Sequence, residues 1–311
     1  MGSSAWGHAL VTVAGDTVLD AWFPEPRLEP VPREALIAPS SLSDQAGPDT
    51  VRGVVVEVRT VAIADLDAPA ATTEDVYLRL HLLSHRLTAP NTVNLDGIFA
   101  LLPAVAWTNA GPMLPETARA RRGALQRAGV GIHSLDKFPR LTDYVVPDRV
   151  RIADTSRVRL GAYLSPGTTV MHEGFVNYNA GTLGASMVEG RISQGVVVGD
   201  GSDIGGGASI MGTLSGGGTH RVAIGERALL GANSGIGISI GDDSVVEAGL
   251  YVTAGTKVAV HDGSGLEPRI VKGVELSGVP GILFRRNSLT GSVEALPRTG
   301  AGIELNAQLH A

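Results

Sequence analysis

The densest group of side chains that could do chemistry lies between Met171 and Ser193. This run contains two carboxylates, Glu173 and Glu189, and the guanidinium of Arg191. A carboxylate can take a proton as a general base or attack an electrophilic carbon as a nucleophile. Arginine binds anionic groups through two parallel hydrogen bonds. The run is therefore a candidate active site, although a surface salt bridge would use the same residue types.

Composition excludes several other kinds of chemistry. The 311 residues include no cysteine, which rules out disulfides, thiolate metal sites and a cysteine nucleophile. The net charge of −6, without a clustered basic segment, argues against a nucleic-acid partner. There is no apolar stretch of about 18 residues and no secretory signal pattern, so we expect a cytoplasmic protein with no membrane partner.

Aliphatic residues recur every six positions from about residue 146 onward. Six fits neither period of an amphipathic helix, but it divides by two, so these residues can all face one side of extended segments. Three six-residue units, each a short strand and a turn, close a triangular coil with the aliphatic side chains inside. The anchors are Val146, Ile152, Val158, Leu164 and Val170; Ile192, Val198, Ile204 and Ile210; Ile224, Leu230 and Ile236; then, after a four-residue shift, Ile240, Val246, Val252 and Val258.

This period predicts a mainly β fold built on a parallel β-helix. A Gly-rich β-sandwich is the alternative, but its strands and turns usually alternate at intervals of about 8–12 residues. The content of 41 glycines and only 4% aromatic residues suits tight, repeated turns. Three segments interrupt the repeat, and such loops often carry function. They are residues 171–193, 211–221 and 260–268.

The flanking regions lack the repeat, and we expect three parts: an N-terminal α/β domain over 1–140, the β-helix over 141–268 and a short C-terminal β cap over 269–311. Thr72 and the acidic residues after it predict the start of a helix that runs to His85. The cap is expected to be a hairpin that turns near 287–291. Further expected elements are a helix over 115–128 and strands over 51–63 and 104–108.

Five segments of the chain carry a family resemblance: 77–86, 137–147, 171–193, 199–220 and 230–243. They are similar to those of the tetrahydrodipicolinate N-succinyltransferases in their actinobacterial form, a family of hexapeptide-repeat acyltransferases. The resemblance implies a left-handed coil, whereas general crossover rules favour the other hand. It also implies a homotrimer with active sites between subunits. Small molecules are then the substrates: succinyl-CoA would give its acyl group to the amino nitrogen of ring-opened tetrahydrodipicolinate.

The resemblance also assigns roles to individual residues. Glu189 matches the catalytic glutamate, as base or as nucleophile, and Arg191 would bind a substrate carboxylate. A structural pair between these two residues is the alternative. For each glycine assigned to succinyl-CoA, a plain turn role is the alternative, because the repeat itself requires glycine. The residues that the resemblance assigns to succinyl-CoA are Gly206, Ser209, Ala232, Glu247, Ala248, Gly255, Lys272, Arg285, Arg286, Asn287 and Ser288.

A metal is a further expectation from the family. Glu173 matches a carboxylate associated with Mg²⁺ near the trimer axis, but the second position holds Ser156 where the family has Asp. Mg²⁺ prefers several oxygen ligands, so this departure weakens the site. Asp154 lies close by in the sequence and would point in another direction.

Three other functions remain open. Another hexapeptide acyltransferase, acting on a sugar amine or on serine, could use His220 as its base. A zinc carbonic anhydrase would need three converging histidines, and His172, His220 and His261 lack ligand-like spacing. A non-catalytic scaffold would not need the polar run over 171–193.

Overall fold

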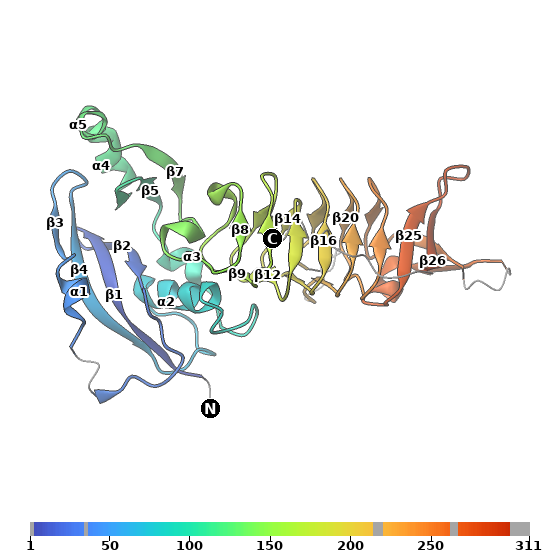
Figure 1. Ribbon diagram of the computed structural model, residues 1–311, viewed down its shortest axis with the longest axis horizontal. Coiled ribbons are helices and arrows are strands. Elements are labelled where there is room, and N and C mark those ends of the chain that lie inside the picture. Colours follow the sequence, from blue (N-terminus) through green and yellow to red (C-terminus); the bar gives the residue numbers. More distant parts are fainter. Residues whose placement is uncertain (1–2, 34–36, 214–219, 262–266, 299–311) are drawn as a thin grey trace. The chain divides into compact units, whose positions relative to one another are not determined.

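The chain is described from a computed structural model, which covers residues 3–33, 37–213, 220–261 and 267–298 (Figure 1). Its contacts divide the chain into two compact units, Met1–Val145 and Val146–Ala311. Each unit is considered separately below. Within the described residues, no helix is both long and apolar enough to cross a membrane.

The first unit combines two antiparallel sheets with short helices. The larger sheet has the strand order β2-β1-β4-β3, and the smaller has the order β6-β5-β7. The strands are β1 (Ala5–Ala14), β2 (Thr17–Trp22), β3 (Gly47–Asp49), β4 (Val54–Ile63), β5 (Val105–Thr108), β6 (Gly111–Met113) and β7 (Ile132–Asp136). The predicted strands at 51–63 and 104–108 correspond to β4 and β5. The hairpin of β1 and β2 was not predicted.

The helices of this unit follow the predicted starts more closely than the predicted ends. Helix α2 begins after Thr72, whose side chain accepts a hydrogen bond from the backbone N–H of Asp75, so the predicted cap is confirmed. The single helix expected over 115–128 is wrong, because Arg121 leaves helical geometry and donates to the backbone of Thr50 at 2.5 Å. The helices are α1 (Ser40–Ser43), α2 (Thr73–Ser84), α3 (Ile98–Leu101), α4 (Pro115–Ala120), α5 (Arg122–Arg127) and the 3-10 turn η2 (Leu141–Asp143).

A buried histidine ties α2 to the larger sheet. Nδ1 of His81 lies 2.8 Å from the carbonyl oxygen of Tyr77, and Nε2 accepts from the backbone N–H of Phe23 at 3.3 Å. A carbonyl can only accept, so Nδ1 carries the proton and the ring is neutral. Burial lowers the pKa of His81 to about 3.

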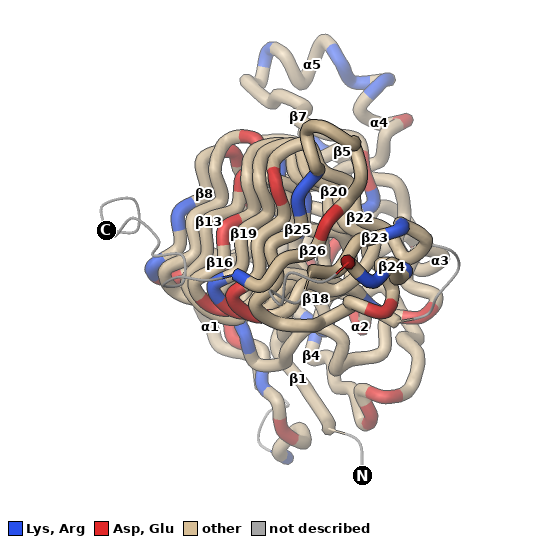
Figure 2. Tube along the Cα trace, turned by 90° about the vertical axis from the view of Figure 1, so that its right-hand side faces the viewer, with Lys and Arg blue, Asp and Glu red and all other residues tan. Residues whose placement is uncertain are grey.

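The second unit is a parallel β-helix whose three faces are three sheets (Figure 1). The ten-stranded sheet runs parallel from β8 to β25 in the order β8-β10-β13-β16-β19-β21-β25, and the five-stranded sheet has the order β11-β14-β17-β20-β22. The remaining four-stranded face has the order β9-β12-β15-β18. Viewed from the side turned by 90°, Lys, Arg, Asp and Glu residues of both signs are scattered over the tube (Figure 2). The predicted mainly β, coiled fold is confirmed.

The strands of the coil are two or three residues long, as the hexad predicts. On the ten-stranded face they are β8 (Arg151–Ile152), β10 (Thr169–Val170), β13 (Ser186–Val188), β16 (Ser202–Ile204), β19 (Leu229–Leu230) and β21 (Val245–Val246). On the five-stranded face they are β11 (Phe175–Val176), β14 (Arg191–Ile192), β17 (Ser209–Ile210), β20 (Gly235–Ile236) and β22 (Tyr251–Val252). On the four-stranded face they are β9 (Ala162–Leu164), β12 (Ala180–Thr182), β15 (Val197–Val198) and β18 (Ala223–Ile224).

Most of the predicted anchors fill the interior of the coil. Those from Val158 to Val258 are at most 3% exposed. Val146 is wrong as an anchor, because it is 88% exposed and the first coil strand begins only at Arg151. The expected interruption over 171–193 is smaller than predicted, because the spacing shortens to four residues only between the buried Val188 and Ile192. Val176, Thr182 and Val188 continue the six-residue spacing as buried positions, and the polar Thr182 had masked it.

The C-terminal part of the unit closes the stack with antiparallel pairs. β23 (Lys257–Val260) pairs with β24 (Arg269–Lys272), and β25 (Ile282–Arg286) with β26 (Val293–Pro297), on either side of the 3-10 turn η4 (Gly273–Leu276). A further 3-10 turn, η3, spans Thr155–Arg157. The predicted hairpin over 282–296 is confirmed. The inserted segments 211–221 and 260–268 lie partly outside the described residues, which leave out 214–219 and 262–266.

Gly181 should be required by the close stacking of two coils. A Cβ at this position would lie 1.8 Å from the carbonyl oxygen of Tyr163, and φ is +152°. We expect Gly181→Ala to lower the melting temperature strongly or to prevent folding, as seen by circular dichroism. Gly255→Ala is the matched control, because a Cβ there meets nothing within 4 Å. Equal melting temperatures for the two variants would contradict this packing.

The neutral His81 should make the first unit sensitive to acid. Its folded pKa of about 3 lies below the value of 6.5 for the free side chain, so the unfolded chain binds the extra proton between these pH values. The free energy of unfolding should therefore fall with decreasing pH across this window, by up to about 1.4 kcal/mol per pH unit from this group.

Denaturant titrations followed by tryptophan fluorescence can measure this effect, because Trp6, Trp22 and Trp107 are the chain's three tryptophans and all belong to the first unit. In His81→Gln the slope with pH should be shallower. The same slope in wild type and variant would exclude His81 as the cause.

Candidate functional site

Seven of the predicted site residues lie along one edge of the β-helix, which we call the first corner. It is the column of turns that follows the strands of the ten-stranded sheet. The inward anchors of that sheet, Val188, Ile204, Leu230, Val246 and Phe284, are in register. The residues after each anchor are therefore stacked as well. The first corner comprises Glu189–Gly190, Gly205–Gly206, Gly231–Ala232, Glu247–Ala248 and Arg285–Arg286.

Backbone hydrogen bonds hold this column in place. The N–H of Glu189 donates to the carbonyl of Ile204 at 2.8 Å, and the N–H of Glu247 donates to Phe284 at 2.9 Å. Between them, Gly231 is so close to the next coil that an added Cβ would lie 2.5 Å from the backbone nitrogen of Ala248. The column is thus a strip of small residues with a carboxylate near each end.

Glu189 is half-buried on the strip, and its carboxylate is beside Gly206. A Cβ added to Gly206 would lie 3.2 Å from Oε2 of Glu189, so a side chain here would crowd the carboxylate. Among the described residues, the Glu189 carboxylate has no hydrogen-bond or ion-pair partner in the chain. The structural pair with Arg191 is therefore absent, and the carboxylate is available to a ligand.

Arg191 and Ser209 lie on the adjoining five-stranded face, paired in register. Nη2 of Arg191 donates to Oγ of Ser209 at 2.6 Å, and the arginine is otherwise exposed. Two coils further on, Tyr251 lies over Gly235, where an added Cβ would be 2.0 Å from the ring. Sequence reasoning missed this half-exposed ring. The signal was available, since Tyr251 precedes an inward anchor as Arg191 and Ser209 do.

The far end of the strip meets the C-terminal hairpin. Oε2 of Glu247 accepts from the backbone N–H of Arg286 at 2.6 Å, which joins the coil to β25. Arg285 pairs with the nearly buried Glu294 at 2.9 Å, and the amide of Asn287 donates to the same carboxylate at 2.7 Å. These hydrogen bonds, that of Asn287 foremost, lower the pKa of Glu294.

Some of the hairpin residues assigned to succinyl-CoA already have partners within the chain. Oδ1 of Asn287 accepts from the N–H groups of Leu289 and Thr290, so Asn287 builds the turn. Arg286 donates to the carbonyl of Gly291 at 3.0 Å and is otherwise exposed, as is Ser288. Of these predicted phosphate-binding groups, Arg286 is the more available and Arg285 is already neutralised.

Lys272 and Gly255 lie near the same end of the coil. Lys272 on β24 is directly opposite Lys257 on β23, and both are exposed. In the described part of the chain, neither ammonium group forms an ion pair. Two neighbouring cations attract phosphate, and sequence reasoning had identified only one of them. Gly255 is exposed, with open space where a Cβ would be.

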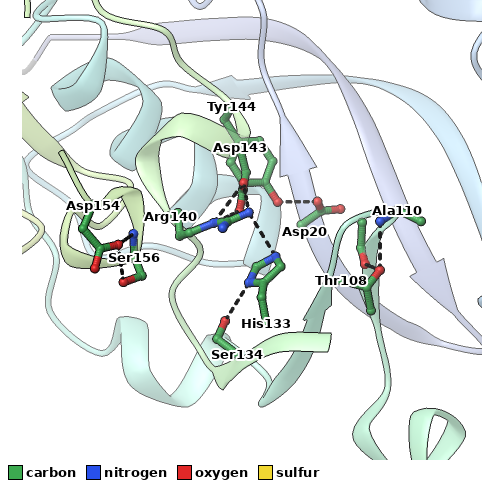
Figure 3. A network of polar contacts seen from close by, with 11 residues as sticks. Asp20, Thr108, Ala110, His133, Ser134, Arg140, Asp143, Tyr144, Asp154 and Ser156 are labelled. Carbon is green, nitrogen blue, oxygen red and sulfur yellow. Dashed lines mark hydrogen bonds and ion pairs between the residues drawn. The ribbon is translucent and has the colours of Figure 1, made fainter. Parts of the chain in front are cut away.

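The predicted magnesium site is not assembled by the residues of one chain. The exposed Glu173 pairs with Arg157 at 3.3 Å and with His172 at 3.0 Å. Ser156 donates from both its backbone N–H and its hydroxyl to Asp154, so this aspartate caps a turn (Figure 3). These hydrogen bonds lower the pKa of Asp154. The described residues contain no group of three His, Cys, Asp or Glu side chains placed to hold a metal.

The histidines of the rival hypotheses lie apart from Glu189 along the coil. His220 is exposed and belongs to the insertion between β17 and β18, which is a different corner. His261 follows β23 and lies 3.6 Å from Glu294. Within one chain, these positions favour Glu189 as the reacting group.

Comparison with known proteins finds similarity in both units of the chain. The family model described as the middle of tetrahydrodipicolinate N-succinyltransferase matches residues 102–140, and the hexapeptide repeat of succinyl-transferase matches 221–254. A crystal structure of a candidate 2,3,4,5-tetrahydropyridine-2-carboxylate N-succinyltransferase from Campylobacter jejuni superposes with a TM-score of 0.80 at 31% identity. The superposition covers 94% of this chain and 92% of the Campylobacter jejuni chain.

Two relatives are closer in sequence, and both are named 2,3,4,5-tetrahydropyridine-2,6-dicarboxylate N-succinyltransferase. The protein of Vibrio cholerae is 60% identical over 80% of this chain and 73% of its own length. That of Pseudomonas aeruginosa is 59% identical over 79% and 72%. Neither organism is an actinobacterium, so these relatives give no support to that qualifier. The chain belongs to the tetrahydrodipicolinate N-succinyltransferase family.

Proposed function

We propose that the protein transfers the succinyl group of succinyl-CoA to the amino nitrogen of ring-opened tetrahydrodipicolinate. The products are N-succinyl-2-amino-6-oxopimelate and coenzyme A, on the route to diaminopimelate and lysine. The observation that carries the proposal is the unpaired Glu189 carboxylate beside Gly206, next to a face that bears Arg191. The family relationship supplies the substrates.

Glu189 acts as the general base in this proposal. The amine nitrogen attacks the thioester carbon, the carbon–sulfur bond breaks, and the amine proton passes to the Glu189 carboxylate while the thiolate leaves. A neutral amine is the nucleophile, so a nearby base is what the step requires. Gly206 keeps the approach to the carboxylate open. Arg191 can form two parallel hydrogen bonds with a substrate carboxylate.

Succinyl-CoA would extend along the coil from Glu189 toward the hairpin. The small residues of the first corner, including Ala232 and Ala248, leave the backbone accessible to the pantetheine arm, with Ser209 and Tyr251 on the adjoining face. Gly255 leaves further open surface on the way. At the far end, Lys272, Lys257 and Arg286 are the exposed cations for phosphates. Arg285, Asn287, Ser288 and Glu247 shape the hairpin that presents them.

The working form is proposed to be a homotrimer in which a second subunit completes each site. The β-helix presents long, flat outer faces, and a single chain leaves Glu189 half-exposed on one of its edges. Magnesium has no part in the proposed mechanism. Because the residues of one chain do not fit that ion, a metal at Glu173 would need copies of this glutamate to meet around the trimer axis.

Replacing the proposed base should remove catalysis while keeping the fold. We expect Glu189→Gln to lower kcat by about 10²- to 10⁴-fold, because the amide cannot take the proton. Thiol release from succinyl-CoA with tetrahydrodipicolinate measures this with a low background, since the protein has no cysteine. Glu226→Gln, at another corner, is the matched control, and sedimentation would verify the assembly. Undiminished turnover in Glu189→Gln would move the base elsewhere, for example to His220.

Thiol release without the acceptor separates the two roles of a carboxylate. A general base should give no release from succinyl-CoA alone. A rapid burst of one thiol per site, absent in Glu189→Gln, would instead mean that Glu189 attacks the thioester and forms an anhydride.

Filling the open surface at Gly255 should weaken the binding of succinyl-CoA selectively. A leucine has room in the chain itself, so Gly255→Leu should fold normally and raise KM for succinyl-CoA about tenfold, with little change in KM for the acceptor. Gly131→Leu is the control, because a Cβ there also meets nothing within 4 Å. An unchanged KM for succinyl-CoA would place the donor away from Gly255.

A further inference from the structure

The first unit contains a polar hollow that the proposed reaction does not use. Its volume is about 360 Å³, within the range of small-molecule sites. β1, β2 and β4 form one wall, the β5–β6 turn another, and the segment of η2 a third. The lining residues that matter here are Asp20, Arg52, Trp107, Arg140, Asp143 and Tyr144.

Arg52 brings unused hydrogen-bond donors to this hollow. It is only 8% exposed. Its Nε–H donates to Asp49 at 2.7 Å and one Nη1–H donates to the carbonyl of Pro112 at 3.2 Å. A guanidinium has five N–H donors. Among the residues that the structure describes, the other three have no acceptor. A nearly buried guanidinium with spare donors favours an anionic ligand group, above all a carboxylate.

Asp20 brings a buried carboxyl group to the same hollow. It is 5% exposed and accepts from the hydroxyl of Tyr144 at 2.5 Å (Figure 3). It also accepts from the backbone N–H of Thr12 at 3.3 Å. Burial raises the pKa of Asp20, while its hydrogen bonds from Thr12 and Tyr144 and the charge of Arg52 oppose this shift. Among the described residues, no cation forms an ion pair with Asp20. An ammonium group placed next to Asp20 would provide that missing charge.

The remaining charged groups at the hollow are already satisfied. Arg140 forms a two-pronged pair with Asp143, with Nη2 at 2.7 Å from Oδ1, and donates to Nε2 of His133 at 3.1 Å (Figure 3). Because arginine can only donate, Nε2 of His133 is the acceptor and the ring is neutral. Burial, helped by the nearby Arg140, lowers the pKa of His133. Arg52, whose ion pair with Asp49 leaves three N–H groups without an acceptor, and Asp20, which forms no ion pair among the described residues, thus line the same cavity.

We propose that this hollow is a second binding site, distinct from the acyl-transfer site, for a small free amino acid. The ligand carboxylate is held by the free N–H groups of Arg52, and its ammonium group by Asp20 with Tyr144. The indole N–H of Trp22 donates to the carbonyl of Tyr144, and that of Trp107 to the carbonyl of Asp136. Both rings therefore offer only apolar surface to the ligand side chain.

Tryptophan fluorescence tests the site directly, because two of the chain's three tryptophans line it. The 311-residue chain is titrated with L-alanine, L-lysine and L-glutamate. Separate titrations use propionate and ethylamine, which carry only the carboxylate or only the ammonium group. We expect a saturable change with at least one amino acid and at least tenfold weaker binding of both half-ligands. No saturable change with any amino acid, verified by calorimetry, or equal binding of a half-ligand, would overturn the proposal.

Variants assign the binding to this hollow. Asp20→Asn should weaken binding of the amino acid at least tenfold. Arg52→Lys should weaken it to the same extent, and it carries a smaller risk to folding than truncation of the side chain. Arg127→Ala, on α5, is the matched control and should bind like wild type. Glu189→Gln should also bind like wild type. Unchanged affinity in both Asp20→Asn and Arg52→Lys, or loss of binding in Glu189→Gln, would place the ligand elsewhere and overturn the inference.

Discussion

The register of the parallel coils is the constraint on which the proposed site depends. Each coil buries its inward aliphatic residues only against the coils above and below it, and the backbone ladder fixes which residues are stacked. Once Val188, Ile204, Leu230 and Val246 are aligned inside, the residues after them must be aligned outside. The same packing that stabilises the coil therefore draws residues from 189 to 286 into a single strip, with no need for long-range contacts between their side chains.

The strip also explains why small residues are common along it. Gly231 is small because the neighbouring backbone is close, so its size is a requirement of the fold. Gly206 borders the Glu189 carboxylate, and Gly255 faces open space, so neither is explained by backbone packing alone. This distinction separates glycines that serve the coil from those that leave room for a ligand. It is also why substitutions at two glycines of the same chain should have different effects.

Much of the fold and of the candidate site could be predicted from local pattern. The hexad identified the buried anchors from Val158 to Val258, and the Thr72 cap and the C-terminal hairpin followed from short-range signals. Errors arose where a tertiary contact overrides the pattern. Arg121 leaves the expected helix and donates a hydrogen bond to the backbone of Thr50. Thr182 occupies a buried anchor position, which a search for aliphatic residues does not find. Val146 has the right spacing but lies before the first coil and is exposed.

The sequence by itself determined the coil, because a period of six constrains each residue through its immediate neighbours. It also identified Glu189 and Arg191 by their likeness to a family. Only the tertiary structure decided which of these groups are free. Glu189 and Arg191 do not pair with each other, Arg285 is neutralised by Glu294, and Lys257 joins Lys272. The hollow lined by Asp20 and Arg52 likewise depends on the three-dimensional structure. Its walls come from strands and turns more than a hundred residues apart in the sequence, and no local sequence pattern predicts that they lie together.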